Sequence, residues 1–257
     1  MSLAADIYPA DWDFAGEHEL HRTHLRQRLA GSFRLFARFG FNEGVAGHIT
    51  ARDPEFSDRF WVNPLAVPFA LMKASDIICL NHDGDVIVGD RNVNPAAYAI
   101  HSQVLQGRPD VNSVVHAHSP YGKAWSAFRH LLEPLSQNAC AFYEDHAVYD
   151  SFEGIVFDPM EGAHIGAALG DKKAVILSNH GNLTVGGTVD EAVHWFVALE
   201  RTCREQLLVD ASRREPVLID PAMARQTAAV IGSAKVARLS FSPMWTWIVH
   251  EEPDLLD

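Results

Sequence analysis

Apolar residues recur every three or four positions over residues 17–38, with arginines between them. This spacing predicts an amphipathic helix that ends at Gly40. Short β-branched or aromatic runs follow, separated by Asn-Pro, Asp-Gly and Gly-Asp pairs, and they read HITAR, RFWV, IICLN and DVIVG. Runs of this length between turn residues predict consecutive antiparallel strands. Pro95 then opens a second predicted helix over about residues 96–105, because proline is tolerated in the first helical turn.

Two later apolar runs each carry histidine at or next to their last residue. VNSVVHAH ends with His116 and His118, and KAVILSNHG carries His180 just before its last residue. In an HxH pair on a strand both side chains lie on the same face, so two neutral imidazoles there can bind one cation together. A third histidine from another strand end completes a three-nitrogen site with open positions, the pattern of catalytic rather than structural metal centres.

Ordinary buried histidines are the alternative, because imidazoles also make structural hydrogen bonds. His101, on the Ala/Ile face of its predicted helix, is assigned to the core or to support of a ligand. The histidines without a partner at ligand spacing are assigned to surface or structural roles, and these are His130, His164, His194 and His250.

Capping residues mark two further helix starts. Ser119 is the predicted N-cap of a helix that begins at Pro120. Thr188 is the predicted N-cap of a long helix over residues 188–209, with Glu191 as its capping-box partner. The histidines therefore lie where predicted strands end and helices or turns begin.

Composition narrows the class of protein. No repeat, low-complexity tract or linker divides the 257 residues, so we expect one domain over 1–257, with peripheral arms at 1–15 and at the acidic end, 250–257. The formal net charge is -12, which disfavours nucleic acid and anionic membranes as partners. No run is long enough to span a bilayer. An odd number of cysteines without CxxC spacing favours a reducing, cytoplasmic location; they are Cys79, Cys140 and Cys203.

Three segments carry a family resemblance. GFNEGVAGHITAR, HSQVLQGRPDVNSVVHAHS and ILSNHGNLTVGGTVDEA resemble the successive signatures of the class II aldolase/adducin family, over roughly residues 25–209. That family includes sugar-phosphate aldolases, an epimerase, decarboxylases and the adducin head domain. The resemblance implies an α/β fold, a three-layer α/β/α arrangement with a largely antiparallel central sheet, and a homotetramer with sites at subunit interfaces. It also implies a divalent metal ion held by His116, His118 and His180, with zinc expected first and Fe(II) or Mn as alternatives.

The chain departs from the sugar-phosphate enzymes of this family at the phosphate contacts. Where the aldolases place Ser-Ser-Glu ahead of the helix histidine, this chain has Pro95, Ala96 and Ala97. His48 replaces a phosphate-binding amide, and Leu65-Ala66 replaces a Thr-Gly pair. A dianion without hydrogen-bond donors is costly to bind, so we expect a small-molecule carboxylate substrate that carries no phosphate.

The missing glutamate also limits the chemistry, because aldol cleavage needs a base and decarboxylation does not. We therefore expect a lyase that favours decarboxylation, with the metal stabilising charge next to the carbon that loses CO2. The segment YEDH offers an acid, with Glu144 first, His146 second and Tyr143 and Asp145 also candidates; the alternative is a polar surface turn. The candidate binders of a substrate carboxylate are Arg52, Arg91 and Lys123.

Two other functions stay open. Three histidines with free coordination positions also suit Fe(II) and dioxygen, and members of the family are known as iron-dependent oxygenases of prenylated aromatic acids. The last alternative is a non-catalytic, adducin-like interaction module, which the intact triad disfavours. Trp245 and Trp247 lie close together in SPMWTWIVH and are assigned to a subunit interface, with the chain's own core as the alternative.

Overall fold

The computed structural model describes residues 16–155 and 158–257, so the predicted arm at 1–15 lies outside the described residues. Its strands form one sheet in the order β4-β3-β2-β1-β5-β8-β7-β6. The strands are β1 (His48–Arg52), β2 (Arg59–Val62), β3 (Ile78–Asn81), β4 (Val86–Val88), β5 (Ser113–Ala117), β6 (His146–Tyr149), β7 (Ala174–Leu177) and β8 (Gly181–Gly186). The helices are α1 (His18–Phe39), α2 (Pro95–Gly107), α3 (Pro120–Ser126), α4 (Pro159–Leu169), α5 (Val189–Ala211), α6 (Pro221–Ile231) and α7 (Ala234–Glu251).

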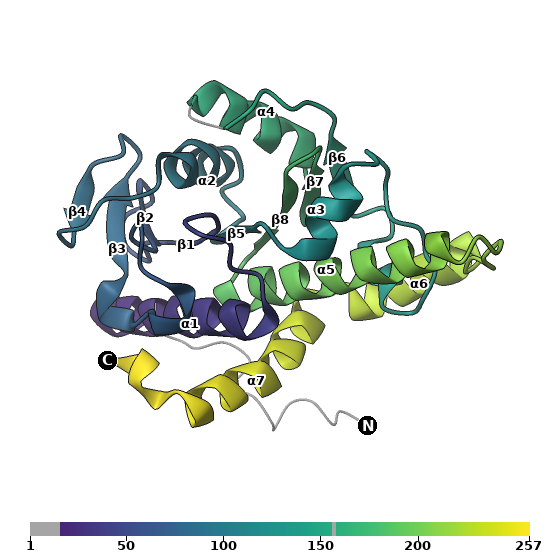
Figure 1. Cartoon of the computed structure of the whole chain (residues 1–257). Coiled ribbons are helices and arrows are strands. Elements are labelled where there is room, and N and C mark those ends of the chain that lie inside the picture. Colours follow the sequence, from purple (N-terminus) through teal and green to yellow (C-terminus); the bar gives the residue numbers. More distant parts are fainter. Residues whose placement is uncertain (1–15, 156–157) are drawn as a thin grey trace.

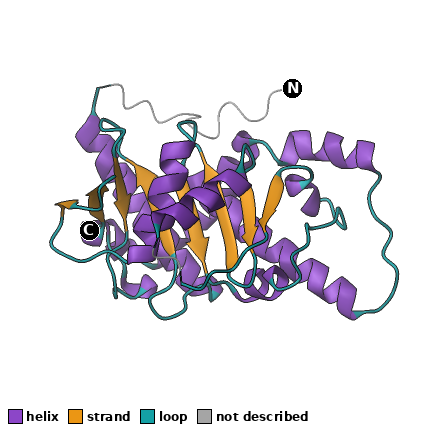
Figure 2. Ribbon diagram, turned by 90° about the horizontal axis from the view of Figure 1, so that it is seen from above, coloured by secondary structure: helices purple, strands orange, loops and turns teal. Residues whose placement is uncertain are grey.

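Helices cover both faces of the sheet and make three layers (Figure 1). α2 and α4 pack on one face, and α1, α5 and α7 pack on the other. Seen from above, the strands lie side by side between these helices (Figure 2). The predicted three-layer α/β/α fold is confirmed. No helix within the described ranges is both long and apolar enough to cross a membrane.

The sheet is antiparallel except at one edge. Neighbouring described strands pair antiparallel along the whole order, apart from β6 and β7, which pair parallel. In the β1–β5 ladder His48 lies opposite His116. Because side chains alternate along a strand, Ile49 enters the core beneath α1 and α5 while Thr50 reaches His101 of α2. Polar side chains of both strands therefore gather on the α2 face.

The predicted helix starts are partly confirmed. Thr188 Oγ1 accepts a hydrogen bond from the Glu191 backbone N–H, which makes Thr188 the N-cap of α5. The Glu191 carboxylate does not close the predicted capping box on Thr188, because it accepts from the Gly187 N–H instead.

Ser119 occupies the predicted N-cap position of α3, but its side chain makes no capping hydrogen bond. Its hydroxyl donates to Glu200 of α5 at 2.5 Å. The same carboxylate accepts from the backbone N–H groups of Tyr121 at 2.7 Å and Gly122 at 2.6 Å. A buried side chain from a distant helix therefore satisfies the first turn of α3.

The acidic end of the chain packs against α1 and is not the peripheral arm expected from its sequence. Leu255 is fully buried in the core. The guanidinium of Arg34, itself buried, pairs with Glu252 and Asp254 at 2.9 Å each. A buried cation needs such partners, and it therefore draws the charged segment onto the helix.

The two tryptophans predicted at an interface differ in their surroundings. Trp245 packs so closely on Gly31 that a Cβ there would lie 2.5 Å from its ring, and the Arg28 guanidinium carbon lies 4.0 Å from its ring centroid. Trp245 thus fills the chain's own packing, contrary to the interface assignment. Trp247 is 40% exposed beside Phe39, and its role at an interface stays a prediction.

Candidate metal centre

Three histidines from separate positions in the chain converge at one end of the sheet. His116 lies on β5, His118 lies just beyond it, and His180 lies in the turn between β7 and β8. One ring nitrogen from each lies within 4.8 Å of the others, and His118 Nε2 is 3.0 Å from His180 Nε2. For comparison, ligand nitrogens around a tetrahedral zinc ion are about 3.3 Å apart. The structure thus brings together the three predicted ligands as a possible metal-binding group.

The turn that presents His180 depends on backbone geometry. Asn179 has a φ of 58°, a left-handed conformation that asparagine tolerates better than most residues. Its N–H donates to the Ser126 carbonyl, and the His180 N–H donates to the Leu177 carbonyl. Gly181 passes so close to β5 that a Cβ there would lie 3.3 Å from the Ala117 carbonyl oxygen. This close approach sets His180 beside the end of β5.

Hydrogen bonding and burial both prepare the triad for a cation. His116 Nδ1–H donates to the Asn182 carbonyl at 2.9 Å, which leaves the Nε2 lone pair for a ligand. Burial lowers the pKa of all three histidines, to about 4 for His180, and neighbouring imidazoles lower those of His116 and His180 further. The rings are therefore neutral at pH 7, the form that binds metal.

Two more histidines lie behind the triad on the α2 face. The His48 ring centroid is 6.2 Å from that of His116 and 5.6 Å from that of His101. His101 Nδ1 bonds to Thr50 Oγ1 at 2.9 Å, but His101 Nε2 and both nitrogens of His48 are buried without a partner among the described residues. Buried polar atoms without partners are rare, and here they fit a site that takes a polar ligand. Ala97, in the first turn of α2, is fully buried and brings no polar side chain.

An ion pair lies at the exposed side of the triad. Lys123 of α3 pairs with Glu43, which lies in the loop between α1 and β1. The stem of Lys123 runs beside the turn of His180, because its Cγ would be 4.0 Å from a Cβ placed on Gly181. Both charges act on the pKa of His118, which burial lowers, Glu43 raises and Lys123 lowers. Glu43 was not predicted, since a single acid in a glycine-containing loop gives no signal in the sequence.

The other two predicted carboxylate binders are already occupied. The Arg52 guanidinium donates to backbone carbonyls, including that of Leu105 at 2.6 Å. Arg91 pairs with Asp76 at 3.5 Å. Of the three cations, Lys123 is the one that the structure places beside the triad.

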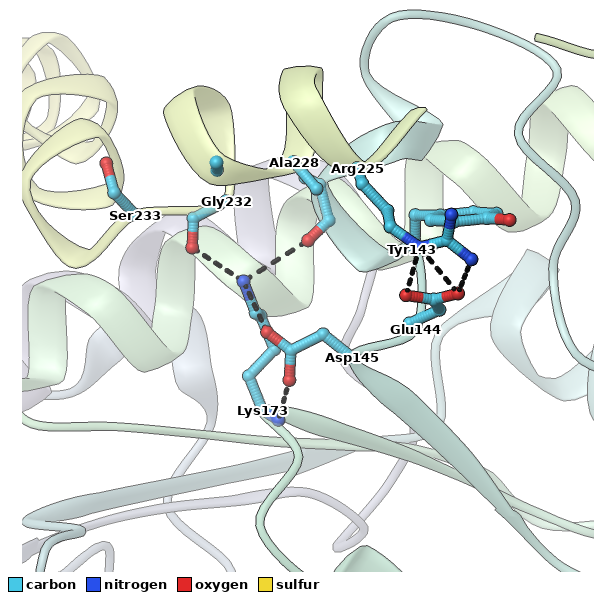
Figure 3. A pocket seen from close by; sticks show the side chains of 10 residues that line it. Tyr143, Glu144, Asp145, Lys173, Arg225, Ala228, Gly232 and Ser233 are labelled. Carbon is cyan, nitrogen blue, oxygen red and sulfur yellow. Dashed lines mark hydrogen bonds and ion pairs between the residues drawn. The ribbon is translucent and has the colours of Figure 1, made fainter. Parts of the chain in front are cut away.

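The structure does not bring Tyr143 and Glu144 to the triad within one chain. They precede β6, whose first residue pairs with the first residue of β7, whereas the triad lies at the other end of β7. Glu144 is exposed and forms a two-pronged ion pair with Arg225 of α6, beside Tyr143 (Figure 3). Only a neighbouring subunit can bring these two residues to a histidine triad.

His146 has a structural position. It is buried, its Nε2 accepts from the Leu132 N–H at 2.8 Å, and its Nδ1–H donates to the Phe142 carbonyl at 2.6 Å. Both ring nitrogens are thus engaged by backbone. Burial also lowers the pKa of His146, so the ring is neutral at pH 7. The predicted acid role does not fit this environment, because no ring nitrogen is left to hold a transferable proton for a substrate.

Comparison with known proteins decides the family. The sequence model of the class II aldolase and adducin N-terminal domain matches residues 27–207. The chain belongs to the class II aldolase/adducin family. Class II aldolases depend on divalent metal ions, and the three histidines of this chain form a group that could hold one. The resemblance read from the three sequence segments is thereby confirmed.

Two relatives differ in the activity that their names give. The chain is 43% identical to Decarboxylase NovR from Streptomyces niveus over 91% of this chain and 87% of the relative. It is 42% identical to 4-hydroxy-3-prenylphenylpyruvate oxygenase/4-hydroxy-3-prenylbenzoate synthase from Streptomyces roseochromogenus subsp. oscitans, over 91% of this chain and 85% of the relative.

A solved structure has nearly the same fold. L-fuculose 1-phosphate aldolase from Glaciozyma antarctica PI12 superimposes with a TM-score of 0.87 at 40% identity, over 93% of each chain. Together with the relatives, this match supports an enzyme of the class II aldolase type.

Proposed function

We propose that the protein is a metal-dependent carbon-carbon lyase that acts on a non-phosphorylated hydroxy, oxo or aromatic carboxylate, and that decarboxylation is favoured over aldol cleavage. The observation that carries the proposal is an assembled histidine triad, together with Ala97 in the first turn of α2, a buried position with no carboxylate or hydroxyl. The relative named as a decarboxylase supports the same class of reaction.

The start of α2 argues against a phosphorylated substrate. Pro95 lacks an N–H, and neither Ala96 nor Ala97 has a polar side chain. The Ala96 N–H is already bonded to the Asn94 side chain at 3.0 Å. A phosphate dianion here would lose hydration without gaining donors, which costs several kcal/mol by the usual scale for unpaired charges.

The residues of the chain divide the remaining work. A divalent ion, when bound, supplies a Lewis acid that stabilises negative charge on a substrate oxygen. The carbonyl of Asn182 orients His116, and the turn at Asn179 orients His180. No group at Ala97 removes a hydroxyl proton, a step that loss of CO2 does not require. We propose zinc as the resident ion, because three nitrogen donors with open positions suit catalytic zinc.

A proton must still reach the carbon that loses CO2. We propose that Tyr143 or Glu144 of a neighbouring subunit in a homotetramer supplies it, with Glu144 first. Glu144 is exposed, and its ion pair with Arg225 holds its pKa below the usual range, so it can carry a proton only when a partner opens this surface pair, at small cost. We place the protein in the cytoplasm, supported by its three free, buried cysteines.

An Fe(II) oxygenase on an aromatic acid is the second candidate. It is favoured by the relative whose name includes an oxygenase activity, and by a triad without a carboxylate ligand. An adducin-like module without catalysis is the least supported alternative, since a non-catalytic domain has no need to hold three neutral imidazoles within ligand distance.

One experiment separates these functions. Metal is quantified in freshly purified protein, which is then incubated with hydroxy, oxo and aromatic acids and with fuculose 1-phosphate, with and without oxygen. We expect CO2 release that is independent of oxygen and lost with EDTA. Oxygen consumption in proportion to substrate, with activity from iron but not zinc, would replace the lyase with the oxygenase. Cleavage of the sugar phosphate would overturn the substrate class.

A further inference from the structure

We propose that Lys123 binds the carboxylate of the substrate, and that Glu43 occupies this binding position in the free protein. The proposal deepens the proposed function and rests on its substrate being a carboxylate. In this proposal the substrate carboxylate takes the place of the Glu43 carboxylate at Lys123.

The position of Lys123 supports the proposal. Lys123 lies one turn into α3, where its N–H donates to the Ser119 carbonyl, and Ser119 directly follows His118. The Lys123 stem runs along Gly181, the residue after His180. The backbone and stem of Lys123 thus lie against Ser119 and Gly181, the residues that directly follow two of the three candidate ligands. A substrate that places one oxygen at the triad can place a carboxylate at Lys123.

Other cations near the site have more partners than Lys123 has. Arg129 approaches the His180 turn, but it donates to the Asn179 side chain at 3.3 Å and pairs with Asp150 at 2.9 Å. Arg52 is fixed by several backbone carbonyls. Lys123 differs, because its side-chain partner is one carboxylate that is 56% exposed.

The loop that carries Glu43 is suited to an exchange. Its backbone is held by a hydrogen bond from the Ala46 N–H to the Glu43 carbonyl and by one from the Asn94 side chain to the Val45 carbonyl. The Glu43 side chain extends from this fixed turn toward solvent. Release of an exposed carboxylate into water costs little, since exposed ion pairs contribute little to stability. A substrate carboxylate can therefore compete with Glu43 for Lys123.

The exchange also explains how an acidic protein admits an acidic ligand. The net charge of -12 repels anions at long range, and an unpaired cation beside the triad would also repel a metal ion. Glu43 neutralises Lys123 until a carboxylate arrives. Lys123 then acts on substrate affinity, so its removal should raise KM and leave kcat within about threefold.

The test measures binding by calorimetry, with three acids as probes: 4-hydroxybenzoate, pyruvate and glycolate. Zinc-loaded and EDTA-treated protein are both titrated, and 4-hydroxybenzamide serves as the neutral counterpart of the first probe. We expect Lys123→Met to weaken the best-bound acid about tenfold and Lys123→Arg to restore most of the affinity. Glu43→Gln should tighten it about threefold, because the internal competitor has lost its charge. Lys73→Met, which removes a lysine paired with Asp257 and about as exposed as Lys123, is the matched control and should bind like the wild type.

Several results would overturn the proposal. These are unchanged acid binding in Lys123→Met, weaker binding in Glu43→Gln, equal effects on the neutral amide, and no binding of any probe by the wild type. The proposed function fails separately: acid binding that follows Lys123 without any CO2 release would retain the carboxylate site and remove the lyase. CO2 release with an unchanged KM in Lys123→Met would retain the lyase and remove the carboxylate site at Lys123.

Discussion

His118 Nε2 lies 3.0 Å from His180 Nε2, so two neutral imidazoles share one hydrogen bond where a cation would be coordinated by both. Each nitrogen is the atom that a metal ion requires, and the His116 Nε2 is kept available by the bond from its Nδ1. A divalent cation replaces one hydrogen bond with three coordinate bonds.

Removing a ring from this contact should release the metal. We expect His118→Ala and His180→Ala each to lower zinc affinity by at least about a hundredfold, because loss of a ligand exceeds the effect of losing its support. Competition with a chromophoric chelator measures the change. His164→Ala, at an exposed histidine of α4, is the control and should bind zinc like the wild type. A full metal complement in His180→Ala would show that the ligands are elsewhere.

The buried carboxylate of Glu200 should matter more to stability than its distance from the triad suggests. Glu200→Ala leaves the N–H groups of Tyr121 and Gly122 without an acceptor, and we expect a loss of about 3 kcal/mol in the free energy of unfolding. Denaturant unfolding measures it. Glu205→Ala on the same helix removes one part-buried hydrogen bond and should cost less than about 1 kcal/mol. Equal losses in the two variants would contradict the capping role.

Asp53 should supply an acid-sensitive part of the stability. Burial alone would raise its pKa, but hydrogen bonds from Arg22, two backbone N–H groups and Trp61 outweigh it and lower the pKa from 3.8 to about 2. A lowered pKa stabilises the fold above pH 4, and this contribution disappears as pH falls through 2. Asp53→Asn should therefore cost about 2 kcal/mol at pH 7 and nearly nothing at pH 2. Asp58→Asn, at an exposed position, is the control and should change the stability at pH 7 by less than about 0.5 kcal/mol.

Two inactive variants should complement each other if the acid comes from a neighbour. We expect His180→Ala and Glu144→Gln to be inactive alone. After the subunits are mixed, about a quarter of the sites in a random tetramer contain an intact triad and an intact neighbouring Glu144, so about a quarter of the activity should return. Mixing His180→Ala with His118→Ala is the control, because both variants damage the same side of the site. No recovery in the first mixture, or sedimentation as a monomer, would remove Glu144 from the reaction.

Local signals in the sequence predicted those parts of the protein that local physics determines. Helical periodicity located α1, and the turn residues after short apolar runs located β1 to β4. The histidine triad was also accessible, because an HxH pair and a strand-end histidine are local patterns. Thr188 caps α5 through a residue only three positions away.

Features that depend on distant partners were not predicted. Ser119 is a helix cap by sequence, yet Glu200, 81 residues away, takes that role. The position of Glu144 depends on the parallel pairing of β6 with β7. The residues of the segment YEDH do not indicate whether the strand after them pairs parallel or antiparallel. The acidic C-terminal segment packs on α1 because Arg34 is buried and needs acidic partners. The sequence of the segment itself does not show that Arg34 is buried.

The β1–β5 ladder determines where the chain tolerates a change of length. His48 faces His116 only in the observed register, and a slip of one residue would turn His48 toward α1 and bring Ile49 to the α2 face. A single residue inserted within β1, between Ile49 and Thr50, should therefore disorganise the centre without changing any ligand. The connection between β1 and β2 lies at the other end of β1, and its exposed residues Ser57 and Asp58 follow the hydrogen-bonded turn of Asp53, so a fluorescent label can be attached there.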